Sequence, residues 1–232
     1  MKNYKEILAD LNAKKDEKFR VFSERIMNIQ PDSSVGVKIP LLRAYARGEV
    51  KDETFDLEEL FSFPDDVFEI KLLKCLCIGY IKMPFVKKVE WIRRAVQMID
   101  GWAVCDLFCS TLKEVKKHRA EFLSEIERYV EEGKEYTQRF GYVMLLGCYM
   151  EPEYLPVIFS LLSKAETKYY YTHMGAAWLI AEVLVKFYEE GVEYLKTCPL
   201  DKKTYNKAIQ KARESFRLTE EQKNLLKSMK KQ

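Results

Sequence analysis

The segment GWAVCDLFCS, residues 101–110, holds the residue types in this sequence that most suggest chemistry. In a helix, Trp102 and Asp106 lie one turn apart on one face, whereas the apolar set around Val104 and Phe108 centres on the opposite side. An aromatic ring and a carboxylate therefore share the face that a hydrophobic core does not need. This arrangement predicts a face that meets a ligand.

A second reading of the same residues is structural. Trp102 would then pack against a neighbouring helix, and Asp106 would accept backbone hydrogen bonds or form a buried ion pair with Arg139. Spacing alone does not separate this alternative from a ligand site.

Cysteine chemistry is a weaker candidate. Cys105 stands beside Asp106, but no neighbouring residue is evident that would lower its pKa, so we expect it to fill the core. The cysteines lie mostly in apolar helical stretches, which favours a reduced, intracellular compartment and predicts a cytoplasmic protein. They are residues 75, 77, 105, 109, 148 and 198.

Metal and cofactor chemistry is not indicated by the sequence. The two histidines, His118 and His173, are far apart, and Cys75 and Cys77 are too close together for a usual zinc site. No Gly-rich turn follows a strand pattern, and no Ser or Cys has an evident His partner. We therefore expect no metal and no cofactor.

The elements that position these residues are predicted to be helices. Only 9 Gly and 7 Pro occur among 232 residues, which disfavours an all-β fold with its many tight turns. Helical periodicity recurs along almost the whole chain, and no apolar run is long enough to span a membrane. The predicted helices cover residues 4–14, 16–29, 39–47, 65–80, 85–99, 102–112, 116–132, 135–150, 153–163, 168–188, 201–214 and 219–230.

These helices alternate in character. The helix over 116–132 has one apolar stripe, as an outer helix has, whereas RFGYVMLLGCYM and MGAAWLIAEVLV are apolar nearly all round, as covered helices are. Trp102, Arg139 and Trp178 follow one another at intervals of 37 and 39 residues, the size of a HEAT-type repeat. We predict one all-α domain over residues 1–232, a right-handed superhelical stack of HEAT-like helix pairs whose concave groove gathers these residues.

Charge is concentrated at the end of the chain. The formal net charge is only +3, but residues 201–232 contain ten Lys or Arg and four Asp or Glu, a net charge of +6. Such a basic helical segment can follow phosphates, because Lys and Arg contacts release the counterions condensed on a nucleic acid. A solvated helical tail is the alternative.

The chain resembles DNA alkylation repair proteins of the AlkD type, which are alkylpurine DNA glycosylases built from HEAT-like repeats. GVKIPLLRAYAR at 36–47 matches the Gly-Val/Ile-x-x-Pro-x-x-Arg stretch of this family, and WAVCD at 102–106 matches its Trp-x-x-x-Asp. QRFGYVMLL aligns Arg139 with the arginine of the family's catalytic groove, and GAAWLIAEVLVK aligns Trp178 with its second groove tryptophan. AIQKARESFRLTEEQK at 208–223 is similar to the end of a less studied branch.

The resemblance implies excision of cationic alkylated purines, of the 3-methyladenine and 7-methylguanine kind, from duplex DNA by a monomeric enzyme. It implies that Asp106 stabilises the sugar cation, that Trp102 and Trp178 contact the cationic nucleotide, and that Arg139 holds a phosphate. One turn after Trp178, where active members carry a further basic residue, this chain has Glu182. The residues that we expect to bind DNA are Lys38, Arg43, Lys202, Lys203, Lys207 and Lys211.

Two other functions fit the same pattern. The chain could bind unusual DNA structures without catalysis, as some branches of this superfamily do, or act as a HEAT-type scaffold for a protein partner. An acidic or apolar wall around Trp102 would favour the scaffold, whereas a basic wall would favour DNA.

Overall fold

The structure is a computed structural model that describes residues 1–27 and 29–232. The described residues form helices and no strand, so the all-α prediction is confirmed. They divide into two compact units, which we call unit 1 (Met1–Glu114) and unit 2 (Val115–Gln232). The single domain expected for the whole chain stays a prediction.

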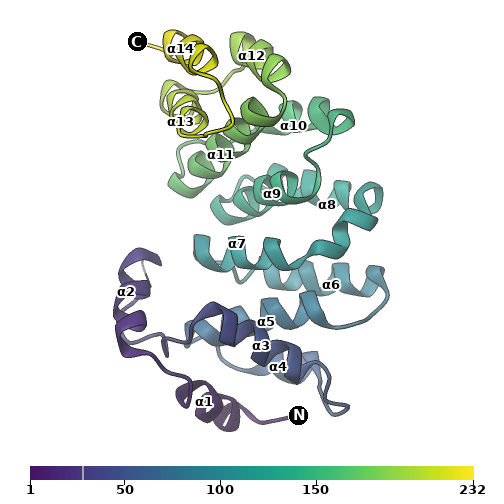
Figure 1. Ribbon diagram of the computed structural model, residues 1–232. Coiled ribbons are helices and arrows are strands. Elements are labelled where there is room, and N and C mark those ends of the chain that lie inside the picture. The colour runs from purple at the N-terminus through teal and green to yellow at the C-terminus, as the bar shows by residue number, and fades with distance from the viewer. Residues whose placement is uncertain (28) are drawn as a thin grey trace. The chain divides into compact units, whose positions relative to one another are not determined.

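In unit 1, α5 packs between α3 and α7, and the intervening helices α4 and α6 also contact α5 (Figure 1). Every residue of α5 from Leu72 to Ile78 is buried, so this helix is the centre of the unit. Alternate helices thus form one layer, as in HEAT-like helix pairs. The helices are α1 (Tyr4–Asn12), α2 (Glu17–Met27), α3 (Ile39–Glu49), α4 (Leu57–Ser62), α5 (Phe68–Tyr80), α6 (Phe85–Val96) and α7 (Trp102–Thr111).

Unit 2 repeats this alternation, with α11 packed between α9 and α13 (Figure 1). α8 contacts α9, α12 contacts α11, and α14 contacts α13. The helices are α8 (Arg119–Glu131), α9 (Glu135–Cys148), α10 (Leu155–Leu162), α11 (Tyr170–Lys186), α12 (Tyr188–Thr197), α13 (Lys202–Arg213) and α14 (Glu220–Ser228). The 3-10 helix η2 (Pro152–Tyr154) also belongs to this unit, and η1 (Lys113–Lys117) contains the boundary between the two units.

The contrast between outer and covered helices is confirmed in unit 2. The apolar stripe of α8, from Phe122 to Val130, is buried, and Gly133 follows the helix with a φ of +67°, a left-handed conformation that Gly adopts without strain. In α9 every residue from Thr137 to Leu145 is buried. α11 is buried on all sides except one narrow stripe.

Two helices depart from the prediction. α4 and α12 were not among the predicted helices, whereas the helix predicted over 168–188 is present as α11. The predicted helix over 16–29 ends at Met27, and its part at residue 28 lies outside the described residues. The right-handed superhelix and the groove spanning the chain stay predictions.

In the part of the chain that the structure describes, no helix has the length and apolar character needed to cross a bilayer. Within the same residues, no three His, Cys, Asp or Glu side chains are grouped so as to hold a metal ion.

Candidate functional site

One face of α7 carries the Trp and Asp side chains. Trp102 is the first residue of the helix, after the extended Gly101, and both Trp102 and Asp106 are half-buried. On the opposite side Val104 and Phe108 are fully buried. The core of unit 1 therefore packs against one side of α7, and the indole and the carboxylate lie together on the other, as the spacing predicts.

Arg43 of α3 lies at the next turn of the same face. Ser110 follows Asp106 by four residues, and the Arg43 guanidinium donates hydrogen bonds to Ser110 Oγ at 2.8 Å and to Thr111 Oγ1 at 3.1 Å. It also donates to the hydroxyl oxygen of Tyr80 in α5, at 2.8 Å. All three acceptors are neutral. These bonds fix the guanidinium beside the α7 face without cancelling its charge.

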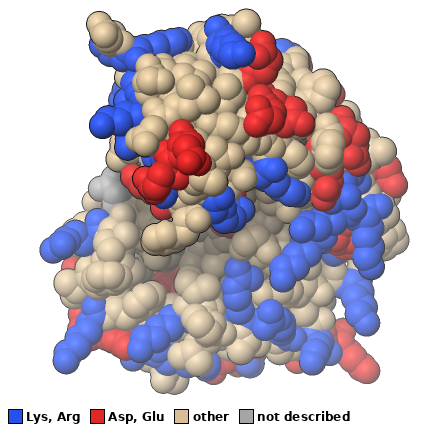
Figure 2. Space-filling view, turned by 45° about the horizontal axis from the view of Figure 1, so that its top comes forward, with Lys and Arg blue, Asp and Glu red and all other residues tan. Residues whose placement is uncertain are grey.

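A hollow of about 550 Å³ lies at the C-terminal ends of α3 and α5. The guanidinium of Arg47 stacks over the ring of Tyr80, 4.6 Å from its centroid, and Lys51 and Lys82 complete a cationic wall. None of these three cations forms an ion pair within residues 1–27 and 29–232. Such a surface attracts anions, and Figure 2 shows patches of Lys and Arg on one face of the molecule.

Lys38, expected to contact DNA, is placed differently from Arg43. It is exposed at the start of α3, and its ammonium forms an ion pair with Asp16 at 2.8 Å. The hydrogen bond from Lys38 lowers the pKa of that carboxyl. Its charge is therefore offset within unit 1.

A residue that the sequence pattern did not single out holds the loop before α3. The buried carboxylate of Glu69 in α5 accepts three consecutive backbone N–H groups, from Val35 at 2.8 Å, Gly36 at 2.7 Å and Val37 at 3.0 Å. Gly36 has a φ of +87°, and a Cβ there would lie 2.6 Å from Arg20 Cβ. Glu69 thus fixes the start of the GVKIP segment, and with it the helix that carries Arg43.

Unit 2 carries Arg139 on α9 and Trp178 on the neighbouring α11. Arg139 is buried, with an exposed fraction of 6%. Its guanidinium donates to the carbonyl oxygen of Tyr171 at 3.3 Å and lies 5.9 Å from the centroid of the Tyr171 ring. Part of its donor capacity is therefore used to join α9 to α11.

Trp178 belongs to the one stripe of α11 that reaches the surface. Met174, Trp178 and Glu182 follow one another at four-residue intervals and are all half-buried. Glu182 accepts a hydrogen bond from Arg217 at 2.7 Å. α11 itself has no basic residue in the turn after Trp178, where Ala181 and Glu182 stand. The segment after α13 brings the guanidinium of Arg217 to this turn instead.

The lysines of the basic C-terminal segment lie on α13. Lys202 and Lys203 are exposed in its first turn, and Lys207 and Lys211 are half-buried. The expected helices of this segment are present as α13 and α14.

The cysteines are core residues, as expected. Cys105 has no exposed surface, and all six thiols are buried and free of disulfides. Burial is the largest cause that raises the pKa of the Cys77 thiol well above its usual value.

The predicted site residues thus fall into two groups. Trp102, Asp106 and Arg43 lie in unit 1, and Arg139 and Trp178 lie in unit 2. The convergence of all of them stays a prediction.

Comparison with known proteins decides the family. Residues 7–216 match the family model described as DNA alkylation repair enzyme. The chain belongs to this family. No curated protein and no solved structure matches it.

Membership in the DNA alkylation repair enzyme family places the function of the chain in the repair of alkylated DNA, with DNA as its substrate. The matched residues include the α7 face, the basic hollow and the Arg139 and Trp178 helices. They also include α13 and end before α14.

Proposed function

We propose that the protein is a DNA glycosylase that releases cationic alkylated purines, such as 3-methyladenine and 7-methylguanine, from duplex DNA by hydrolysis. The observation that supports this most is the half-buried Asp106 on the same face of α7 as Trp102, one turn before Ser110, which accepts a hydrogen bond from Arg43. A carboxylate, an aromatic ring and a cation are the groups that this reaction needs for the sugar, the base and the phosphate.

The alkylated purine carries a positive charge before the reaction, so it leaves without a general acid. When the bond between C1′ and N9 breaks, its electron pair goes to the purine, which departs neutral. Positive charge then develops on the deoxyribose, and the Asp106 carboxylate stabilises it. A water molecule adds to C1′ and gives its proton to Asp106, which leaves an abasic site.

The aromatic residues would recognise the charge of the substrate. The electron-rich face of Trp102 attracts a cationic purine or an oxocarbenium sugar, an interaction worth about 1–2 kcal/mol when water is excluded. We assign the same chemistry to Trp178 in unit 2, and a phosphate contact to Arg139. An enzyme that uses such open faces has no need of a deep pocket for a flipped base.

Base release tests the proposal. Duplex DNA containing 7-methylguanine is incubated with the protein, and free base is measured by chromatography while abasic sites are measured by alkaline cleavage. We expect both products in equal amounts, and none from unmodified duplex. Tight binding of DNA without any release would instead identify a noncatalytic DNA binder, and an absence of DNA binding would favour a protein scaffold.

The cations of the basic hollow are expected to supply phosphate contacts. The double variant Arg47→Gln and Lys82→Gln removes two cations that have no carboxylate partner within the described residues. The slope of log K against log salt should therefore become shallower by about 1.8, since each phosphate contact contributes about 0.9. Fluorescence anisotropy of a labelled duplex at several salt concentrations measures this.

The matched control removes two exposed lysines of unit 1 that do not line the hollow, Lys5→Gln and Lys87→Gln. It deletes the same charge and should change the slope much less. Equal changes in both double variants would show that general charge, rather than this hollow, determines the affinity.

A further inference from the structure

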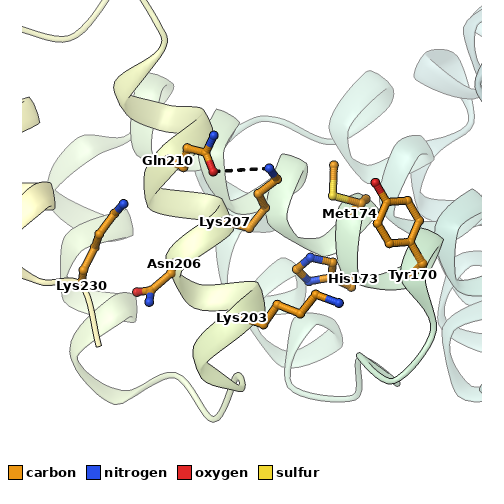
Figure 3. A pocket seen from close by; sticks show the side chains of 8 residues that line it. All are labelled: Tyr170, His173, Met174, Lys203, Asn206, Lys207, Gln210 and Lys230. Atoms are coloured by element: carbon orange, nitrogen blue, oxygen red, sulfur yellow. Dashed lines mark hydrogen bonds between the residues drawn. The ribbon is translucent and has the colours of Figure 1, made fainter. Parts of the chain in front are cut away.

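A second basic hollow, of about 380 Å³, lies in unit 2 between α11 and α13 (Figure 3). Its wall includes His173 of α11, Lys203 and Lys207 from successive turns of α13, and Lys230 from the end of the chain. No carboxylate is among its lining residues. We call it the α11–α13 pocket.

The three lysines of this pocket have no acidic partner. Lys203, Lys207 and Lys230 form no ion pair within the described ranges, and the one hydrogen bond of the Lys207 ammonium goes to the neutral side chain of Gln210, at 3.3 Å. Three like charges around one hollow repel one another and destabilise the protein slightly. A bound anion would remove this repulsion.

The position of Lys230 is set by the structure. Asn206 of α13 donates from Nδ2 to the carbonyl oxygen of Lys231 at 2.9 Å and accepts from the backbone N–H of Lys231 at 3.0 Å. The Lys231 ammonium also donates to the carbonyl oxygen of Leu200 at 2.8 Å. These bonds attach the end of the chain to α13, so Lys230 belongs to the pocket wall rather than to a loose tail.

The buried His173 has a defined proton arrangement. Although burial opposes it, hydrogen bonds led by those from Thr204 lower the pKa of Asp201 to about 2, so this carboxylate is ionised and can only accept. The Thr204 hydroxyl donates its single proton to Asp201 at 2.6 Å, and it therefore accepts from Nδ1–H of His173 at 2.8 Å. In the neutral ring, Nε2 is left as an acceptor.

The charges near His173 oppose its protonation. Burial is the largest cause that lowers the pKa of this imidazole, followed by the positive charges of Lys203 and Lys207, while Asp201 acts in the opposite direction. Tyr170 of α11 and Lys230 are the other titratable groups on the pocket wall. An anion in the pocket offsets the lysine charges, so Nε2 gains a proton and becomes a further donor toward that anion.

We propose that the α11–α13 pocket is a phosphate-binding site, held by Lys203, Lys207 and Lys230 and completed by a proton that His173 takes up on binding. Because the protein acts on DNA, the phosphate is that of a DNA backbone. The site does not depend on the proposed glycosylase reaction, because none of its residues takes part in that chemistry.

Proton NMR of the full-length protein tests the site directly, because His118 and His173 are the two histidines of the sequence. His118→Gln assigns the two C2–H signals. We expect inorganic phosphate, and separately a short unmodified duplex, to raise the pKa of His173 while that of His118 stays unchanged. Equal shifts of both histidines, or no shift with either ligand, would overturn the proposal. A response to inorganic phosphate but not to duplex would overturn the assignment to DNA.

Matched lysine variants provide the second test. Lys203→Gln with Lys207→Gln removes two pocket lysines, and Lys202→Gln with Lys211→Gln removes the same charge from α13 outside the pocket. We expect the pocket variant to bind duplex about tenfold more weakly, the equivalent of about 1.4 kcal/mol. We expect the wild type to bind duplex more tightly as the pH falls from about 7.5 to 5.5, and the pocket variant to lose this dependence.

The control should keep this pH dependence and lose affinity only a few-fold. Equal losses in the two double variants would show a diffuse basic surface and overturn the pocket. Repeating the NMR titration in Asp106→Asn separates the two proposals, because that variant should lose base release and keep the His173 response.

Discussion

Asp106→Asn is expected to abolish base release from alkylated duplex while leaving duplex binding within about twofold of the wild type. The amide has the shape of the carboxylate, so the packing of the half-buried side chain is kept. Its negative charge is lost, and with it the stabilisation of the sugar cation and the acceptor for the proton of water. Single-turnover rates should fall on the order of 10³-fold, the usual effect of removing such a group.

The control for this variant is Asp100→Asn. Asp100 is an exposed carboxylate just before α7 that pairs with Lys71, so its replacement removes the same charge near the same helix. Its release rate should stay within about twofold of the wild type. If Asp106→Asn released base at the wild-type rate, Asp106 would not be the catalytic group. If it lost binding as well as release, the structural role considered from the sequence would be correct.

Helical periodicity predicted most of the fold because each long helix has an apolar face that the core must cover. It did not predict the helices whose buried residues are too few to show a period. α4 has six residues and buries only Leu57 and Leu60, too few to show a period. α12 was missed for the same reason, because it has ten residues and buries only Gly191 and Leu195.

The α7 face was predictable for the same reason, since Trp102 and Asp106 are close in sequence. The groups around that face were not predictable, because their positions depend on contacts between segments that are distant in the sequence. Arg43 was expected to bind DNA, but its three hydroxyl partners come from α5 and α7. Likewise, the basic character of residues 201–232 was evident, yet only the bonds between Asn206 and Lys231 bring Lys230 to the pocket that Lys203 and Lys207 also line.

Glu69 shows this limit most clearly. In sequence it is one acidic residue in the first turn of a helix, where a carboxylate usually faces solvent and helps the helix dipole. In the structure it is 2% exposed and binds a loop more than thirty residues away. The pattern of a single sequence contains no signal for such a contact.

Glu69→Ala is therefore expected to destabilise unit 1 strongly. The variant leaves the N–H groups of Val35, Gly36 and Val37 without their acceptor in a buried place, and unsatisfied buried donors cost about 1–3 kcal/mol each. Since water will satisfy some of these donors, we expect the free energy of unfolding to fall by about 3–5 kcal/mol. The control Glu90→Ala, which replaces an exposed residue, should change it by less than about 0.5 kcal/mol.

Urea unfolding followed by tryptophan fluorescence measures this effect. Both variants are made in a protein that also carries Trp178→Phe, so that the remaining tryptophans, Trp91 and Trp102, both report on unit 1. A midpoint for Glu69→Ala equal to that of Glu90→Ala would show that the three hydrogen bonds do not stabilise the loop. Because the loop sets the start of α3, the variant should also weaken duplex binding through Arg43 under conditions where it is still folded. Loss of stability without loss of binding would mean that α3 keeps its place without this contact.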